Sequence, residues 1–511
     1  MSSVQLQPAL ESLKSTIEAD YALNPNLPAN TYPVFSFMLA DSLTPHLAYL
    51  KLARPGHPDS SPSFLFESAI GGEKLDRYSF IGTNPRKIIK TGNGFGPDVD
   101  PLVELETELK PYRQTKQASV LPNLSGGAIG YVSYDCVKYF EPRTARELQD
   151  PLGLPEAALM LFDTIVAFDN VFQRIQIIHN IHIPDSVDRQ NFDIDSEYRN
   201  AKTIISDTIA VLTSLESYNP PQPPVRVNPE YVSNIGQEGY ESHVRNLREH
   251  ILKGDIIQAV PSQRVAHATD LHAFNIYRHL RTVNPSPYLF YIDFLDFQIV
   301  GASPELLVKS EKGRILTHPI AGTVKRGKTA EEDDQLASEL LSSQKDRAEH
   351  VMLVDLARND INRVCDPLSC SVDRLLTVER FSHVIHLVSQ VSGVLRPDKT
   401  RFDAFRSIFP AGTVSGAPKI RAMELIAELE RERRGVYAGA VGHWGYDSQS
   451  MDTCIALRTM LVKDGIAYLQ AGGGIVYDSD PYEEYIETVN KMKANRQCLE
   501  DAEEIWAAKT T

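Results

Sequence analysis

The chain has 511 residues, a length typical of about two to four domains. Its 42% hydrophobic and 23% charged residues are typical of a soluble globular protein, and no apolar run is long enough to cross a membrane. The net charge of -15 excludes non-specific binding to nucleic acid, which needs a basic surface. An anionic substrate must therefore be held by local cations.

The cysteines and the N-terminus indicate the compartment. The 5 cysteines are scattered and form no CxxC pair, which indicates reduced thiols. The N-terminal segment resembles neither a secretory signal nor an Arg-rich transit peptide. We therefore expect a cytoplasmic protein.

Short alternating runs in the first part of the chain predict strands, over 63–68, 128–134, 164–168 and 175–181. A proline-rich stretch follows at 219–230, where fixed φ angles and missing donors exclude a helix or a central strand. We therefore predict three parts: an N-terminal region over 1–218, a linker over 219–229 and a larger domain over 230–511.

Beyond the linker, helical and strand patterns alternate without the regular rhythm of parallel βαβ units. Apolar spacing predicts helices over 240–253, over 331–363 with a possible break, from about 418, and from about 482 to 498. Ser415 is the expected cap of the third helix. The runs 289–295 and 298–300 predict a hairpin. This mixture favours an α+β fold with antiparallel sheets.

The segment from Gly322 to Thr329 imitates a nucleotide-binding loop. It matches GxxxxGK[ST], in which backbone N–H groups cradle phosphates and the lysine neutralises them. The acidic residues 331–334 follow at once and would repel a triphosphate. We therefore interpret the segment as a basic turn before an acidic first helical turn, with a P-loop enzyme as a minor alternative.

Two pairs of carboxylates stand three residues apart in helical sequence: Asp346 with Glu349, and Glu484 with Glu487. Residues i and i+3 share one face of a helix, so two such helices brought together would offer four oxygen ligands suited to Mg²⁺. Acidic pairs at this spacing most often lie on a solvated face. The spacing alone therefore does not establish a metal site.

Longer motifs are more specific than these patterns. They are GDIIQAVPSQR (254–264), GASPELL (301–307), HPIAGT (318–323), EHVMLVDLARND (349–360), HVIHLVSQVSG (383–393), GTVSGAPK (412–419), MDTCIALRTML (451–461), QAGGGIVYDSDP (470–481) and ETVNK (487–491). In this order they closely resemble the chorismate-binding enzymes, and among these the large subunits of anthranilate synthase. Weaker similarity extends upstream through LFESA (65–69) and DRYSFIG (76–82).

The resemblance implies a large antiparallel β-sandwich flanked by helices, with an N-terminal regulatory subdomain packed on the catalytic domain. Two positions separate branches of the family. Members that add water carry an activating lysine where this chain has Gln258, and a neutral amide suits ammonia, which needs no general base. Many aminodeoxychorismate synthases carry a nucleophilic lysine where this chain has Ala321.

The implied reaction is Mg²⁺-dependent amination of chorismate at C2 by ammonia, then elimination of pyruvate to give anthranilate for tryptophan biosynthesis. Aminodeoxychorismate and isochorismate synthases are the nearest alternatives, and a non-catalytic regulatory paralogue is another. The ammonia is expected from a glutamine amidotransferase on another chain, because no GxCxG nucleophile motif occurs here.

The resemblance also implies roles at the metal and the leaving group. Glu349 and Glu487 are the expected Mg²⁺ ligands, with Asp346 and Glu484 as a second pair beside the ion. Glu305 is the expected general acid for the departing C4 hydroxyl, which needs a carboxyl that stays protonated near neutral pH. The other expected catalytic residues are His386, beside this hydroxyl, and Gln258. A histidine in an apolar run is also compatible with a core position.

The expected substrate-binding residues are Thr413, Tyr437, Arg458, Gly472, Gly473, Gly474 and Lys491. Arg458 and Tyr437 would hold the enolpyruvyl carboxylate, since arginine suits bidentate recognition. The three glycines would let backbone N–H groups approach a carboxylate, although such a triplet is also compatible with a plain turn. Lys491 would neighbour the metal carboxylates.

Feedback inhibition by L-tryptophan is a further implication. The matching pocket residues are Glu67, Ser68, Asn284, Pro285, Ser286, Pro287, Tyr288 and Cys454, with Leu65 and Leu289 as possible lining. The NPSPY run is alternatively a simple turn before a strand. We expect Cys454 and Arg458 on one strand, which would couple this pocket to the substrate carboxylate.

Overall fold

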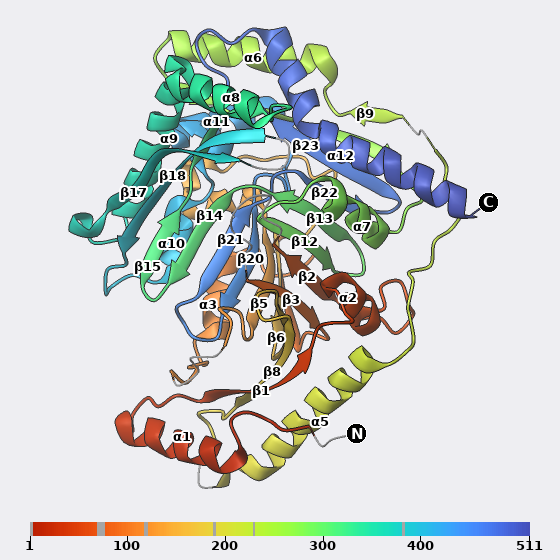
Figure 1. Ribbon diagram of the computed structural model, residues 1–511. Helices are drawn as coiled ribbons and strands as arrows, with labels where there is room; N and C mark the ends of the chain where they lie inside the picture. The colour runs from red at the N-terminus through yellow and green to blue at the C-terminus, as the bar shows by residue number, and fades with distance from the viewer. Residues whose placement is uncertain are drawn as a thin grey trace.

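In a computed structural model, the protein is described over residues 4–68, 77–116, 121–187, 191–227, 230–380 and 384–510 (Figure 1). The helices are α1 (Leu10–Leu23), α2 (Pro45–Ala53), α3 (Pro101–Leu109), α4 (Val137–Phe140), α5 (Ile194–Thr213), α6 (Gly236–Leu252), α7 (Ala273–Val283), α8 (Ala330–Ser342), α9 (Gln344–Asn362), α10 (Arg401–Ile408), α11 (Lys419–Glu430) and α12 (Pro481–Thr510).

The strands are β1 (Thr31–Leu39), β2 (Ser63–Glu67), β3 (Tyr78–Thr83), β4 (Lys87–Thr91), β5 (Gly127–Val132), β6 (Ala157–Phe162), β7 (Thr164–Asp169), β8 (Arg174–His182), β9 (Tyr231–Ser233), β10 (Gln258–Ala259), β11 (Ser262–Ala268), β12 (Tyr288–Asp293), β13 (Gln298–Ser303), β14 (Leu306–Glu311), β15 (Arg314–Thr317), β16 (Ile320–Lys325), β17 (Ser371–Arg380), β18 (Val384–Val394), β19 (Gly416–Ala417), β20 (Ala440–Gly445), β21 (Met451–Ile455), β22 (Thr459–Lys463) and β23 (Ile466–Gly472).

Two large antiparallel sheets dominate the part of the chain that the structure describes. One has 11 strands in the order β1-β8-β7-β3-β2-β12-β13-β22-β23-β11-β9. The other has 10 strands in the order β16-β18-β15-β14-β21-β20-β5-β6-β4, with β17 also paired to β18. The predicted α+β fold with antiparallel sheets is confirmed.

The hydrophobic core lies in three layers. The middle layer lies between the two sheets and contains side chains from both, including Phe64, Ile129, Phe290 and Cys454. Helices α2, α5, α7 and α12 cover the outer face of the 11-stranded sheet, and α3, α9, α10 and α11 cover that of the other. Because each sheet buries apolar side chains on both faces, the result is a sandwich flanked by helices.

Strands from both sides of the proline-rich linker are interleaved in both sheets. Leu65 of β2 pairs with Tyr291 of β12, and Val132 of β5 pairs with Ala440 of β20. The described linker residues, 219–227, contain no helix or strand. The N-terminal region therefore completes the two sheets to which the later strands belong.

Several local predictions are confirmed and others corrected. The hairpin is β12 with β13. The long helix is broken at Ser343, whose hydroxyl caps α9 by accepting from the Asp346 N–H. The predicted cap at Ser415 is wrong, because its hydroxyl donates to the Ala411 carbonyl and α11 begins after Pro418.

The C-terminal helix is longer than predicted. It begins at Pro481 and continues past Cys498 to Thr510, because Leu499 and Ala502 extend its buried face. It packs along β23, α6 and α7 (Figure 1). Within the described residues, no helix is long and apolar enough to span a bilayer.

The P-loop imitation is a capped turn. The N–H of Gly327 donates to Asp333 over 2.5 Å and that of Lys328 donates to Glu332 over 2.7 Å. The backbone donors that a phosphate would need are thus bound by the acidic first turn of α8. This supports the interpretation as a basic turn before an acidic helix.

Candidate active site

Glu305 lies in the connection between β13 and β14 and is only 5% exposed. Burial raises its pKa to about 8, although the Thr413 hydroxyl, the Ile320 N–H and the charge of Arg458 favour the ionised form. The Thr413 hydroxyl donates to its Oε1 over 3.0 Å. Glu305 is therefore mostly protonated at neutral pH, which is the state a general acid requires.

His386 lies on β18, directly across from Thr323 of β16. Its Nδ1 is 2.9 Å from the Thr323 hydroxyl and 3.2 Å from the Gly322 carbonyl oxygen. Since a carbonyl only accepts, this geometry assigns the ring hydrogen to Nδ1. Burial, and then the charge of Arg458, lowers the pKa of His386 to about 4, so the imidazole is neutral.

Arg458 is not on the strand of Cys454, which corrects the prediction. It lies between β21 and β22 with φ of 48°, where the chain crosses from the 10-stranded to the 11-stranded sheet. A straight strand cannot make that crossing. Its carbonyl accepts from the Ala302 N–H, and its guanidinium has no hydrogen bond or ion pair to any described residue. A half-buried cation in this state is suited to bind a carboxylate.

The glycine triplet brings the two carboxylate helices together. A Cβ on Gly473 would lie 3.0 Å from Glu484 Oε2 and 3.8 Å from Glu487 Oε1. A Cβ on Gly474 would collide with the Gln258 amide and lie 3.6 Å from Glu349 Oε1. Glycine is therefore required here for close approach, and the predicted carboxylates of α9 and α12 meet at this turn.

Tyr437 and Lys491 border the same turn. The Gly472 N–H hydrogen-bonds to the Tyr437 hydroxyl, whose pKa is raised to about 12, chiefly by burial. The Lys491 ammonium lies 2.7 Å from Glu487 and donates to the Gly472 carbonyl over 2.9 Å. The predicted lysine is thus adjacent to a predicted metal ligand.

The donor set fits a hard cation. Burial raises the pKa of Glu349 and of Glu484, and the charge of Glu487 adds to both shifts. Glu484 Oε2 is a buried oxygen with no hydrogen-bond partner among the described residues. A bound cation would favour the ionised form of both carboxyls and would give Glu484 Oε2 a partner.

The four predicted carboxylates do not surround a common metal position in this structure. Among the described residues, no group of three His, Cys, Asp or Glu side chains is placed to hold a metal ion. Asp346 is hydrogen-bonded to Ser343 at the start of α9, and its charge acts on Glu349. Ion binding would therefore need side-chain rotations on α9 and α12.

Gln258 joins this group from β10. It is 3% exposed, and its Nε2 donates to Glu349 Oε1 over 3.1 Å. Its Oε1 is buried and has no hydrogen-bond partner in the described part of the chain. The amide is thus oriented by a predicted metal ligand, with an acceptor atom left to bind a donor.

The sequence pattern of the chorismate binding enzyme family matches residues 61–497. The chain belongs to the chorismate-binding enzymes. It is 65% identical over 508 residues to anthranilate synthase component 1 of Saccharomyces cerevisiae, covering 99% of this chain and 98% of that relative. It is 58% identical to probable anthranilate synthase component 1 of Schizosaccharomyces pombe, covering 94% and 95%.

Solved structures agree. Anthranilate synthase component I from Streptococcus pneumoniae TIGR4 matches with a TM-score of 0.69 at 36% identity, over 90% of this chain and 98% of that chain. The menaquinone-specific isochorismate synthase of Escherichia coli matches with a TM-score of 0.69 at 19% identity, over 96% and 100%. The second match shows a shared fold alone.

Two of the segments predicted for tryptophan, the end of β2 and residues 284–288, lie beside each other in this chorismate-binding enzyme. Glu67 ends β2 directly across from Leu289 of β12, so Ser68 adjoins the 284–288 segment. Ser68 Oγ and Asn284 Nδ2 are buried and have no hydrogen-bond partner among the described residues. These two atoms are suited to a polar ligand.

Glu67 has partners that the sequence analysis did not identify. Its carboxylate accepts from the Tyr277 hydroxyl over 2.7 Å and from Arg281 over 2.9 Å. Both lie on α7 at positions i and i+4, but no local pattern links them to β2. Cys454 is buried between the sheets, across from Leu306.

Proposed function

We propose that this chain is the ammonia-using component of an anthranilate synthase, which makes anthranilate from chorismate for tryptophan biosynthesis. The burial of the Glu305 carboxyl, which raises its pKa to about 8, is the observation that carries the proposal. A reaction that expels the C4 hydroxyl needs such a proton donor. The similarity to relatives named anthranilate synthase component 1 supports the same reaction.

The residues account for the steps in order. Ammonia adds at C2 while Glu305 gives its proton to the C4 hydroxyl, which leaves as water. The ring then loses the C2 proton while the C3–O bond of the enolpyruvyl ether breaks, which releases pyruvate and makes the ring aromatic. The Arg458 guanidinium holds one substrate carboxylate. The N–H groups of Gly472 and Gly473 already bond to the hydroxyls of Tyr437 and Tyr240, so we assign the second carboxylate to the N–H of Gly474. We assign the neutral imidazole of His386 to the side of the leaving hydroxyl.

Gln258 favours ammonia over water as the nucleophile. Water needs a base to remove its proton, and an amide cannot serve as one. Ammonia reacts as a neutral molecule, and the buried Gln258 Oε1 is an acceptor for one of its N–H groups. This distinguishes the proposal from an isochorismate synthase activity.

We further propose that Mg²⁺ binds at the glycine turn, held by Glu349 and Glu487 with Glu484 beside them. When bound, the ion supplies a Lewis acid for the ring carboxylate of chorismate. Lys491 neutralises Glu487 in the present arrangement. Asp346 stabilises the start of α9 and contributes negative charge near the ion.

We also propose two partners. A glutamine amidotransferase subunit supplies ammonia, in agreement with the relatives' designation as component 1. L-Tryptophan binds beside Ser68 and Asn284 and inhibits. Its ammonium, carboxylate and indole N–H all need partners once desolvated, and the unpaired atoms of these two residues can supply some of them.

Product analysis tests the proposal. The purified chain is incubated with chorismate, Mg²⁺ and ammonium, and the products are separated and identified. Fluorescent anthranilate is expected, and glutamine should not replace ammonium. Isochorismate or aminodeoxychorismate as the main product would assign the chain to another branch of the family.

A further inference from the structure

Arg434 is a buried cation between α11 and β20, with 2% of its surface exposed. Its Nε and one terminal nitrogen donate to the two carboxylate oxygens of Glu430 over 2.8 and 2.7 Å. The guanidinium also donates to the carbonyl oxygens of Val260 over 2.6 Å and Val414 over 2.9 Å. One side chain therefore connects α11 to two separate loops.

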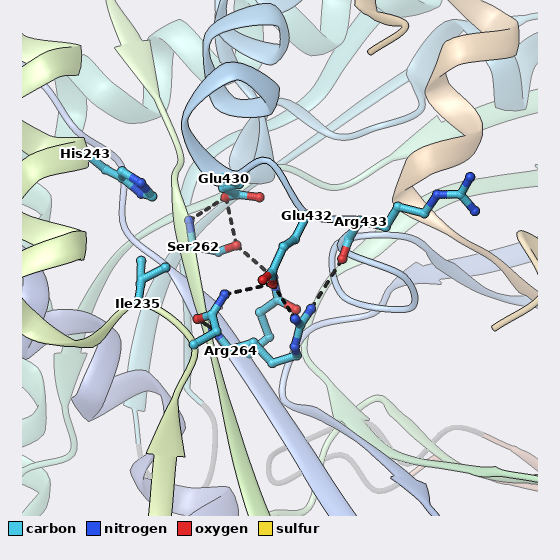
Figure 2. Close-up of a pocket in the computed structure, with 9 residues that line it drawn as sticks. Ile235, His243, Ser262, Arg264, Glu430, Glu432 and Arg433 are labelled. Atoms are coloured by element: carbon cyan, nitrogen blue, oxygen red, sulfur yellow. Dashed lines mark hydrogen bonds and ion pairs between the residues drawn. The ribbon is translucent and has the colours of Figure 1, made fainter. Parts of the chain in front are cut away.

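Glu430 adds a connection to β11. Its Oε1 accepts from the Ser262 N–H over 2.7 Å and from the Ser262 hydroxyl over 2.9 Å. Figure 2 shows both bonds at the end of α11, in a small pocket also lined by Arg264 and Glu432. Ser262 in turn pairs with Gly472 of β23. The ion pair thereby restrains the start of the glycine turn.

The connected segments all carry proposed site residues. Val260 lies two residues after Gln258, and Val414 directly follows Thr413. The guanidinium carbon of Arg434 lies 5.6 Å from the ring centre of Tyr437, a cation–π distance. The same guanidinium carbon lies 4.4 Å from the ring centre of Tyr134, which is a second cation–π contact.

We propose that the Arg434–Glu430 ion pair is a positioning element of the chorismate site, which holds four substrate-binding segments in register without touching the substrate. The inference rests on the proposed function, because those segments carry the residues assigned to chorismate. A buried ion pair is weak evidence for stability, since desolvation offsets much of its attraction. Its hydrogen bonds to separate loops supply orientation, and small errors of position at a binding site are costly.

Lysine cannot replace this arginine. Its ammonium keeps the charge but lacks the planar fork that reaches a carboxylate and two carbonyls at once. Arg434→Lys is therefore expected to loosen the loops while the protein stays folded. Glu430→Gln keeps the shape but weakens the bonds to Arg434 and Ser262, and it provides an independent test.

Arg401 offers a matched control. It is 3% exposed and donates to the carbonyl oxygens of Ser450 over 2.6 Å and Gly445 over 2.9 Å, in a turn that carries no proposed site residue. Arg401→Lys makes the same chemical change in a comparable environment. It should lower the melting temperature without changing chorismate affinity.

The experiment compares melting temperature, kcat, KM and calorimetric chorismate affinity for wild type and the three variants, with Mg²⁺ present. Arg434→Lys and Glu430→Gln should raise KM and weaken chorismate binding about tenfold, with kcat changed less than about threefold. Wild-type KM in either folded variant, or an equal rise in Arg401→Lys, would overturn the inference. A wild-type protein that binds chorismate but makes no anthranilate would instead refute the proposed function, and the affinity comparison would still decide the inference.

Discussion

The hydroxyl of Ser286 donates a hydrogen bond to the carbonyl oxygen of Ser303 over 2.5 Å. Ser303 donates its own hydroxyl to the Ile455 carbonyl over 2.6 Å and accepts from the Glu305 N–H over 3.3 Å. Ser286 belongs to the proposed tryptophan pocket, and Glu305 is the proposed acid. Ser303 thus connects the pocket to the catalytic loop.

Ser286→Ala should weaken the coupling between tryptophan and chorismate. The substitution removes one hydrogen bond worth about 1 kcal/mol, so the factor by which each ligand weakens the other should fall about fivefold. Titrations of tryptophan with and without chorismate and Mg²⁺ measure that factor. Ser407→Ala is the control, because the buried Ser407 hydroxyl also donates to a carbonyl, that of Asp360. Equal tryptophan affinity with and without chorismate in the wild type would refute the regulatory proposal.

Thr413→Val should shift the alkaline limb of the pH–activity profile to higher pH. Glu305 acts in its protonated form, so wild-type activity should fall as the pH rises through about 8. The Thr413 hydroxyl lowers the pKa of Glu305, and its removal raises that pKa further. The value of kcat/KM is measured against pH at a constant concentration of free ammonia. An unchanged alkaline limb in the variant would mean that Glu305 does not control it.

Glu349→Gln and Glu487→Gln should each reduce turnover at least about a hundredfold, because each removes a charged oxygen ligand from a hard-cation site. The Mg²⁺ concentration for half-maximal activity should rise in any variant with residual activity. Glu483→Gln is the matched control, since Glu483 is exposed in the first turn of α12, four residues before Glu487. Full activity at wild-type Mg²⁺ levels in either ligand variant would exclude that residue from the metal site.

Gln258→Lys should allow some addition of water at C2. The lysine amine would reach the position of the Gln258 amide beside Glu349 and could act as a general base. Isochorismate or salicylate should appear as a minor product in chromatography, alongside reduced anthranilate. Gln258→Leu, which has no base, serves as the control. A fully active variant with an unchanged product profile would show that Gln258 does not face C2.

The sequence by itself determined the family and most of the proposed site residues. The motifs that carry Glu305, Glu349 and Glu487 are contiguous runs of residues, so they could be identified without knowledge of the fold. The i, i+3 spacing of the carboxylates also follows from helix geometry alone. Local hydrophobic patterns likewise predicted the hairpin of β12 and β13.

Only the tertiary structure decided the position of Arg458, the raised pKa of Glu305 and the contacts of Arg434. Arg458 lies between β21 and β22 because the chain changes sheets there. That change depends on the pairing of strands distant in sequence. The pKa of Glu305 depends on burial by segments remote in sequence. The i, i+4 spacing of Glu430 and Arg434 indicates a simple helical ion pair. Burial and long-range hydrogen bonds instead connect that pair to two loops and β11, and no local pattern records such contacts.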